Sequence, residues 1–136
     1  MKRTVLNLVM VVCALIFFNF ESTKDLTTNS LVAKISFESQ TIDYGEIVQH
    51  SDGSRQFTFE NTGDTPLVIT HVKTTCGCTV PSYSKEPILP GKTGIINIKY
   101  DTRRVGAFSK SIRVLSNTAS EITILKIKGT VILPQG

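Results

Sequence analysis

The fold is decided by the stretch Thr93-Gly94-Ile95-Ile96-Asn97-Ile98-Lys99-Tyr100. From Ile96 onward, apolar side chains alternate with the polar side chains of Asn97 and Lys99. Successive side chains of an extended strand point to opposite faces, so one face of this stretch is expected to be buried while the other meets water. The pattern therefore predicts a half-buried β-strand over residues 93 to 101.

Similar short runs of β-branched and aromatic residues occupy the chain beyond residue 34, and none has the apolar spacing of a helix. Phe57 and Phe59 share one face of their run, and turn formers such as Ser51-Asp52-Gly53 separate neighbouring runs. The expected strands cover residues 34 to 38, 41 to 48, 54 to 60, 66 to 74, 93 to 101, 108 to 116 and 121 to 132. About seven such strands predict an all-β, immunoglobulin-like sandwich.

The last expected strand changes its alternation partway along. Ile122 and Ile124 occupy even positions, whereas Leu125 and Ile127 occupy odd ones. Because an extra residue in one strand switches which side chains face the core, this change predicts a β-bulge between Ile124 and Leu125.

The N-terminus has the pattern of a secretory signal. A basic start, Met1-Lys2-Arg3, precedes an apolar stretch over residues 5 to 18, and the polar run Glu21-Ser22-Thr23-Lys24 follows. The sequence therefore predicts export to the periplasm or cell envelope. The small residues expected before a cleavage site are not clearly placed, so a signal peptide and an uncleaved membrane anchor both remain open. Cys13 lies too deep in the apolar stretch to favour lipid attachment.

These features divide the chain into three parts. Residues 1-22 are expected to form the signal peptide or anchor, residues 23-33 a tether, and residues 34-136 one sandwich domain.

The formal net charge of +4 falls to +3 without residues 1 to 22, which leaves 13 Lys and Arg against 10 Asp and Glu. Basic residues are scattered among apolar strand residues, which argues against nucleic acid as a partner. The expected partner is an envelope protein or glycan, with membrane contact only through an uncleaved N-terminal segment.

Several short motifs occur in a fixed order along the domain, namely Tyr44-Gly45, Phe59-Glu60-Asn61-Thr62-Gly63, Pro66-Leu67-Val68-Ile69, Thr75-Cys76-Gly77-Cys78-Thr79-Val80-Pro81, Pro90-Gly91-Lys92 and Tyr100-Asp101. In these motifs the chain resembles the bacterial family catalogued as domain of unknown function 1573, over residues 35 to 132. The resemblance implies a small exported domain with an immunoglobulin-like fold, related to the Hydin-type and major-sperm-protein-type sandwiches. It implies no established activity.

Cys76 and Cys78 are the two cysteines of the expected domain. In extended backbone their thiols share one face, and Gly77 lets the chain bend until the sulfur atoms approach. They can form a local disulfide or pack as two reduced thiols. A disulfide that closes so short a loop restrains the unfolded chain little, so a reducible pair with a redox role is a further possibility.

Metal binding is the third possibility for the cysteine pair. Two thiolates at this spacing suit copper in its Cu(I) form or half of a zinc site, and His71 lies five residues upstream of Cys76. The candidate metal ligands are thus Cys76, Cys78 and His71, although His71 can equally be an ordinary strand residue and no second cysteine pair completes the set.

No pattern typical of an enzyme active site was found. A thiol enzyme would need one cysteine supported by histidine and an orienting amide or carboxylate, and the isolated glycines Gly91 and Gly94 precede a strand, unlike a phosphate loop. We therefore expect no catalytic residues and a non-catalytic binding or structural module that uses loops or an exposed sheet edge. The alternative is a thiol-redox or soft-metal protein that works through Cys76-Gly77-Cys78.

Overall fold

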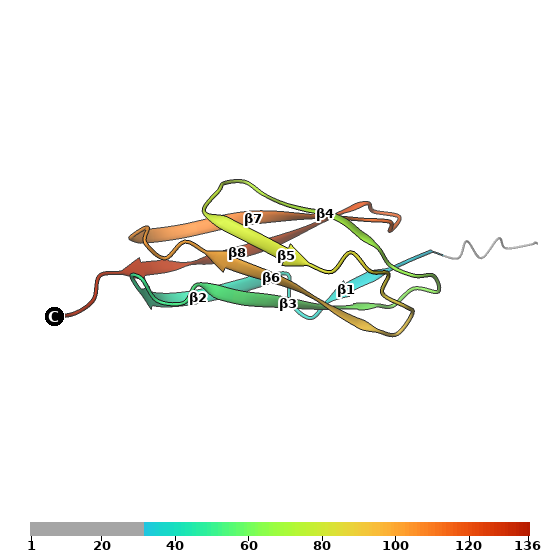
Figure 1. Cartoon of the computed structure of the whole chain (residues 1–136), viewed down its shortest axis with the longest axis horizontal. Helices are drawn as coiled ribbons and strands as arrows, with labels where there is room; N and C mark the ends of the chain where they lie inside the picture. Colours follow the sequence, from blue (N-terminus) through green and yellow to red (C-terminus); the bar gives the residue numbers. More distant parts are fainter. Residues whose placement is uncertain (1–31) are drawn as a thin grey trace, which may run out of the picture. The chain divides into compact units, whose positions relative to one another are not determined.

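The computed structural model describes residues 32–136, which form two four-stranded sheets (Figure 1). The first sheet has the order β1-β3-β6-β5 and the second the order β2-β8-β7-β4. All pairs are antiparallel except the parallel pair β2–β8. The strands are β1 (Ile35–Phe37), β2 (Thr41–Val48), β3 (Ser54–Asn61), β4 (Ile69–Thr74), β5 (Thr79–Tyr83), β6 (Thr93–Tyr100), β7 (Gly106–Ser116) and β8 (Ile122–Ile132). The all-β sandwich expected from the sequence is confirmed.

The core lies between the sheets and follows the predicted alternation. Phe57 and Phe59 of β3 are buried, as are Ile96 and Ile98 of β6, which lies beside it. Leu125 contributes a fully buried side chain from the opposite sheet. At about 25 cal/mol per Å² of apolar surface, these side chains provide the main stabilisation of the sandwich.

Two differences from the sequence-based expectation change which residues belong to the strands and to the sandwich. The run expected over residues 66 to 74 forms a strand only from Ile69, while Leu67 makes an isolated bridge to Ile88. At the N-terminal end, Ala33 is buried and bridges Thr118, so residues 32 and 33 of the expected tether are part of the sandwich. The expected signal segment 1-22, Cys13 and the rest of the tether lie outside the described residues.

The bulge predicted between Ile124 and Leu125 is wrong. Strand β8 pairs with β7 without interruption from Ile122 to Val131. The change of parity has another cause: Leu125 faces the core, whereas Ile124 points to solvent with 48% of its surface exposed. Register shifts occur instead in β2 and in β4.

Strand β5 was not expected from the sequence. It contains Pro81, and a proline inside a run argues against a strand because it cannot donate a backbone hydrogen bond. The structure accommodates Pro81 because β5 is an edge strand of its sheet. The domain therefore has eight strands where about seven were expected.

Aromatic side chains pack at the end of the sandwich where β2, β6 and β7 meet. The rings of Tyr100 and Phe108 are stacked with centroids 3.8 Å apart, and the Tyr44 ring meets the Phe108 ring edge-on. The Tyr44 hydroxyl donates to the Gly53 carbonyl oxygen at 2.8 Å, and burial raises the pKa of Tyr44 to about 12. This cluster fixes the position of the turn that contains Gly53.

Candidate functional site

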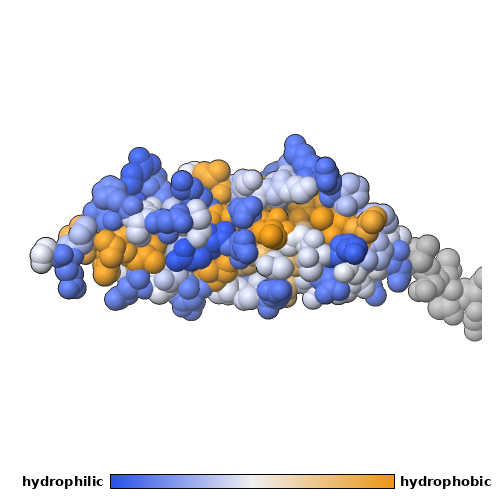
Figure 2. Space-filling model, turned by 60° about the horizontal axis from the view of Figure 1, so that its bottom comes forward, coloured by the Kyte–Doolittle hydropathy of each residue, from blue (hydrophilic) through white to orange (hydrophobic). Residues whose placement is uncertain are grey.

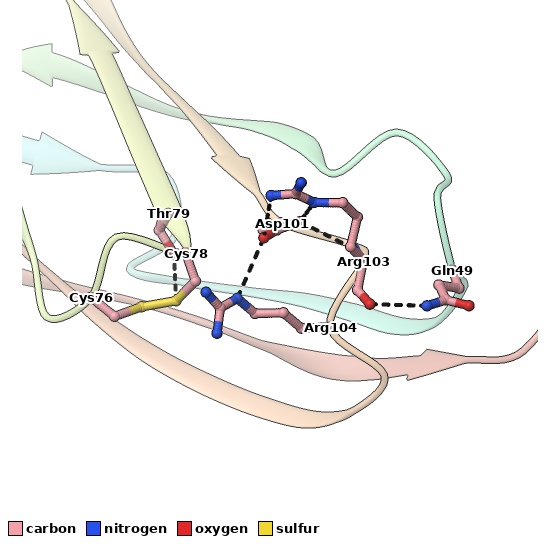
Figure 3. A network of polar contacts seen from close by, with 7 residues as sticks. All are labelled: Gln49, Cys76, Cys78, Thr79, Asp101, Arg103 and Arg104. Carbon is pink, nitrogen blue, oxygen red and sulfur yellow. Dashed lines mark hydrogen bonds and ion pairs between the residues drawn. A yellow bond between two sulfur atoms is a disulfide. The ribbon is translucent and has the colours of Figure 1, made fainter.

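The candidate site is the loop between β4 and β5, where the structure joins Cys76 and Cys78 in a disulfide (Figure 3). The two Cα atoms are 5.3 Å apart. Cys78 is buried with the core, while Cys76 is half-buried. This arrangement corresponds to the local disulfide among the alternatives that the sequence left open, and it leaves Cys76 as the more exposed of the two cysteines.

Hydrogen bonds hold this loop against the neighbouring strands. The Thr74 hydroxyl lies within bonding distance of two backbone oxygens, 2.9 Å from that of Cys76 and 3.1 Å from that of Thr79. The Asp101 N–H donates to the Cys78 carbonyl oxygen at 2.8 Å. A Cβ atom added at Gly77 would meet nothing within 4 Å. The loop is therefore held at both cysteines, while its tip at Gly77 stays open to solvent.

A charged network lies beside the disulfide. Asp101 accepts hydrogen bonds from the Arg103 guanidinium at 2.8 and 3.0 Å and pairs with Arg104 at 3.4 Å. In Figure 3 the Arg104 side chain extends toward the disulfide. The Arg103 hydrogen bond is the main cause that holds the pKa of Asp101 well below its usual range. Asp101 is therefore a permanent anion near neutral pH, and it is unsuited to the work of a general acid or base.

Residues from three turns line a hollow of about 610 Å³ around this loop. The turn between β2 and β3 contributes His50 through Gly53, the turn after β6 contributes Asp101 through Arg103, and the disulfide loop contributes Gly77 and Cys78. A second hollow of about 830 Å³ shares Val80 and Lys99 with it. That hollow extends over the outer face of β3, β5 and β6, where its other lining side chains include Ser54, Gln56, Ser82 and Asn97.

Apolar side chains are also exposed at the surface. Figure 2 shows one face of the domain on which hydrophobic surface lies between hydrophilic groups. Val80, with 62% of its surface exposed, is the large apolar side chain common to both hollows. Ile95, on the same face of the sheet as Lys99, is 46% exposed and lines neither hollow.

The structure does not bring His71 into a cluster with the cysteine pair. His71 is an exposed residue of β4 that pairs with Leu115 of β7. His50 lines the first hollow in a left-handed conformation, with φ at 66°. Within residues 32–136, no three His, Cys, Asp or Glu side chains are grouped to hold a metal ion. Metal binding by Cys76, Cys78 and His71 therefore stays a prediction, and it requires the reduced thiols.

The edge strand β5 is closed to strand addition by Pro81. The Tyr100 N–H donates to Gly53 on the β3 side, so the backbone groups of the preceding residue, Lys99, point toward β5. The backbone groups of Val80, which lies opposite Lys99, therefore hydrogen-bond to β6. The backbone groups of the next residue, Pro81, point toward the open edge of the sheet, where proline has no N–H to donate to an added strand.

The edges of β2 and β4 are partly occupied by side chains. The Thr41 N–H donates to the Ser39 hydroxyl at 3.2 Å, and the Gly45 N–H donates to Asp43 at 2.8 Å, so two backbone N–H groups of β2 bond to nearby side chains. On β4, the Tyr83 hydroxyl donates to the Thr70 carbonyl oxygen at 3.3 Å. Partners are thus better accommodated by loops and sheet faces than by these edges. Between residues 32 and 136, no helix has the length and apolar character needed to cross a bilayer.

The Asp101 network and the hollow were not found by sequence reasoning. In the sequence, Tyr100-Asp101 is only one of the motifs that carry the family resemblance, and no local pattern places Asp101 beside the cysteine pair. The closeness of Asp101 to Cys78 depends on the pairing of β5 with β6, which brings Thr79 opposite Tyr100. The sequence did not indicate this pairing, because β5 itself was not predicted.

Comparison with known proteins gives a family and a fold. The family model described as "Protein of unknown function (DUF1573)" matches residues 35–131, well over half of the chain. No curated protein matches. A protein of unknown function from Porphyromonas gingivalis W83 is similar in structure, with a TM-score of 0.66 and 17% identity. The match covers 72% of this chain and 46% of that one, so the present chain spans about half the length of its relative.

Two further solved structures extend this similarity. The ASH/PapD-like domain 7 of human CEP192 has a TM-score of 0.65 at 12% identity, with 85% of this chain and 97% of that domain covered. The VesB protease of Vibrio cholerae has a TM-score of 0.56 at 14% identity, with 76% of this chain but only 32% of the protease covered. At these identities the similarity shows an immunoglobulin-like fold alone.

Proposed function

Because the chain belongs to the family of proteins of unknown function DUF1573, we propose a role from its own residues: it is an exported immunoglobulin-like domain of the cell envelope that acts as a non-catalytic binding module. The hollow around the disulfide loop carries this proposal. It presents backbone groups, Val80 and Lys99 from strands and turns that are held in place before any partner arrives. Such preorganisation reduces the entropy lost on binding.

The chemistry of the hollow supports binding over catalysis. Its carboxylate Asp101 is fixed as an anion by arginine, and the pKa of Asp52 is lowered chiefly by the Ser54 hydroxyl. Catalytic acids and bases need a pKa near the working pH, which neither group has. The partner is an envelope protein or a glycan that covers Val80 and places polar groups on the turns.

The proposed location rests on two features. The basic and apolar N-terminal stretch has the pattern of an export signal, and disulfides persist in oxidising compartments outside the cytosol. Fractionation of cells that express the full chain tests the location. The protein should be recovered with the envelope, and recovery in the cytosol with free thiols would overturn the proposal.

Replacing Val80 and Lys99 with serine should weaken partner capture about tenfold or more, because anchors at the centre of an interface supply most of the binding energy. The measurement is capture from envelope extract with the full chain as bait, followed by affinity measurement with the captured partner. Ile95→Ser is the matched control, since Ile95 is exposed on the same sheet face outside both hollows. Equal loss in this control would contradict the proposed site.

A second candidate function, thiol–disulfide exchange, is favoured by the accessibility of Cys76. A thiolate of an external dithiol would attack the Cys76 sulfur and break the disulfide, and Cys78 would leave as a thiolate that then takes up a proton. The second thiol of the donor would then release Cys76, so the donor is oxidised to a disulfide while the domain gains two electrons and two protons. The disulfide joins two cysteines that are only two positions apart in the sequence, so the loop that it closes is very short.

If exchange is the function, mild dithiol should release two free thiols per folded chain. Reduction should lower the free energy of unfolding by no more than about 2 kcal/mol, because so short a loop restrains the unfolded state little. Thiol counting and urea unfolding measure the two quantities, and mass spectrometry of the reduced protein with Cu(I) or Zn²⁺ tests the metal alternative. A pair that resists dithiol until the domain unfolds would exclude the exchange function, and the Cys76→Ser/Cys78→Ser variant is the blank.

A further inference from the structure

The outer face of the sheet β2-β8-β7-β4 gathers cations that are far apart in the sequence. Lys73 of β4, Arg113 of β7, and Lys126 and Lys128 of β8 are all exposed. They point outward because they alternate with buried residues that face the core, such as Ile112, Val114, Leu125 and Ile127. The strand register therefore makes one basic face from residues that the sequence disperses. We name Lys73, Arg113, Lys126, Lys128, Ile122 and Ile124 the basic face.

Two of these cations lie directly opposite each other. Lys73 pairs with Arg113 across β4 and β7. Like charges at directly opposite positions of neighbouring strands destabilise a sheet. Within residues 32–136, the ion pairs of the structure include neither of these two side chains nor Lys126. The arrangement thus lowers stability without compensation inside the described domain, which is expected of groups that serve an external anion.

The acidic residues of this sheet face lie to one side. Asp43 and Glu46 both belong to the edge strand β2, and Asp43 pairs with Lys128 at 3.3 Å. Across the other three strands, Lys73, Arg113 and Lys126 are not accompanied by an acidic residue in the outward positions. An anionic ligand is therefore expected to cross β4, β7 and β8 while it avoids β2.

Exposed isoleucines border the cations. Ile124, with 48% of its surface exposed, lies directly opposite Arg113, and Ile122, with 38% exposed, lies opposite Leu115. Side chains of this size gain about 25 cal/mol per Å² when apolar surface is removed from water. A complementary ligand must therefore provide apolar groups beside its negative charges.

We propose that the basic face binds an acidic segment of an envelope partner protein that carries apolar side chains among its carboxylates. The carboxylates pair with Lys73, Arg113 and Lys126, and the apolar side chains cover Ile122 and Ile124. A polyuronate glycan would leave the isoleucines uncovered. An anionic membrane would bring its headgroups against Asp43 and Glu46 on the same face. The inference rests on the proposed binding role, but it uses a surface that shares no residue with the two hollows.

Nucleic acid is a poorer match for this surface. Proteins that bind single strands stack bases on aromatic side chains, and no aromatic residue occupies an outward position of β7 or β8. Duplexes are bound chiefly through their phosphates, which the isoleucines do not complement. The acidic, apolar peptide is the ligand class that matches both components of the face.

The test uses the full chain and a labelled twelve-residue peptide that repeats Glu-Leu-Glu-Glu, with an all-glutamate peptide of equal length beside it. Anisotropy should show tighter binding of the leucine-containing peptide and weaker binding as salt rises. Arg113→Ser should reduce both affinities about two- to fivefold, as for one exposed ion pair. Ile124→Ser should reduce only the advantage of the leucine-containing peptide.

Two controls separate this inference from the proposed function. Lys99→Ser removes a cation from the opposite sheet and from the hollows, so it should leave peptide affinity unchanged. Arg113→Ser should preserve or raise the free energy of unfolding at low salt, because it relieves the repulsion with Lys73, whereas a structural Arg113 would lower it. If the variant with serine at Val80 and Lys99 captures the partner as well as the unchanged protein does, while peptide binding stays intact, only the proposed function is overturned.

The inference fails on several specific results. It is wrong if neither peptide binds, if Arg113→Ser binds both peptides as well as the unchanged protein does, or if the all-glutamate peptide binds equally well. It is also wrong if phosphatidylglycerol vesicles, polyuronate or duplex DNA bind more tightly than the leucine-containing peptide and compete it away.

Discussion

Replacing Asn61 with alanine should lower the free energy of unfolding by about 3–4 kcal/mol. The Asn61 side chain is fully buried and donates to the carbonyl oxygens of Thr65 at 2.7 Å and Ile88 at 2.9 Å. Its own oxygen accepts from the Gly63 N–H at 3.0 Å. Alanine removes these bonds. The Ile88 carbonyl oxygen keeps the Leu67 N–H as a donor, but the buried Gly63 N–H and the Thr65 carbonyl oxygen lose the Asn61 side chain as their partner, which costs about 1–3 kcal/mol for each group that water cannot reach.

The measurement is urea unfolding, with the midpoint and slope compared between variants. Asn117→Ala is the matched control, because Asn117 makes the same kind of backbone bonds, to the Val68 N–H and the Pro66 carbonyl oxygen, from an exposed position. Water can replace those bonds, so its loss should stay near 1 kcal/mol or below. Equal losses in the two variants would show that burial of Asn61 is not the cause.

The strands of the sandwich could be predicted because their side chains alternate. In β6, Ile96 and Ile98 occupy the same face and are both buried, as the pattern indicated. The role of Asn61 could not be predicted in this way. An Asn-Thr-Gly sequence indicates a turn, but which backbone groups the buried amide satisfies depends on where Ile88 arrives from a distant loop.

The candidate site was only partly predictable for the same reason. Cys76 and Cys78 are two residues apart, so their proximity follows from local geometry. Asp101 lies next to Cys78 only because β5 pairs with β6. The sequence did not predict β5, because Pro81 argues against a strand at that position. The basic face depends in turn on register, since only the pairing of β4 with β7 brings Lys73 opposite Arg113. Local patterns thus predicted elements, whereas contacts between distant elements required the fold.

The parity change in β8 links fold to function. The sequence suggested a bulge there because apolar residues on both faces of one strand are unusual in a half-buried sheet. The strand is regular, and Ile122 and Ile124 are instead exposed beside cations. A departure from the expected alternation without a structural cause is more consistent with a surface that another molecule covers.

Replacing Gly53 with alanine should lower the free energy of unfolding by about 2–4 kcal/mol and also weaken partner capture at the hollow. An alanine Cβ atom at this position would overlap the Tyr100 carbonyl oxygen and lie 3.0 Å from the Thr102 side chain. The turn must therefore move away from β6. That movement strains the bonds by which Tyr44 and the Tyr100 N–H hold the Gly53 carbonyl oxygen, at 2.8 and 3.0 Å.

Gly77→Ala is the matched control, because Gly77 lines the same hollow and an added Cβ atom there meets nothing within 4 Å. Its unfolding free energy should change by less than about 0.5 kcal/mol, as for surface substitutions away from special features. If Gly53→Ala unfolds like the unchanged protein, the turn is not held by the aromatic cluster. If the variant loses stability yet captures the partner as well as the unchanged protein does, Gly53 is not part of the binding surface. The proposed binding surface would then be limited to the part of the hollow around Val80 and Lys99.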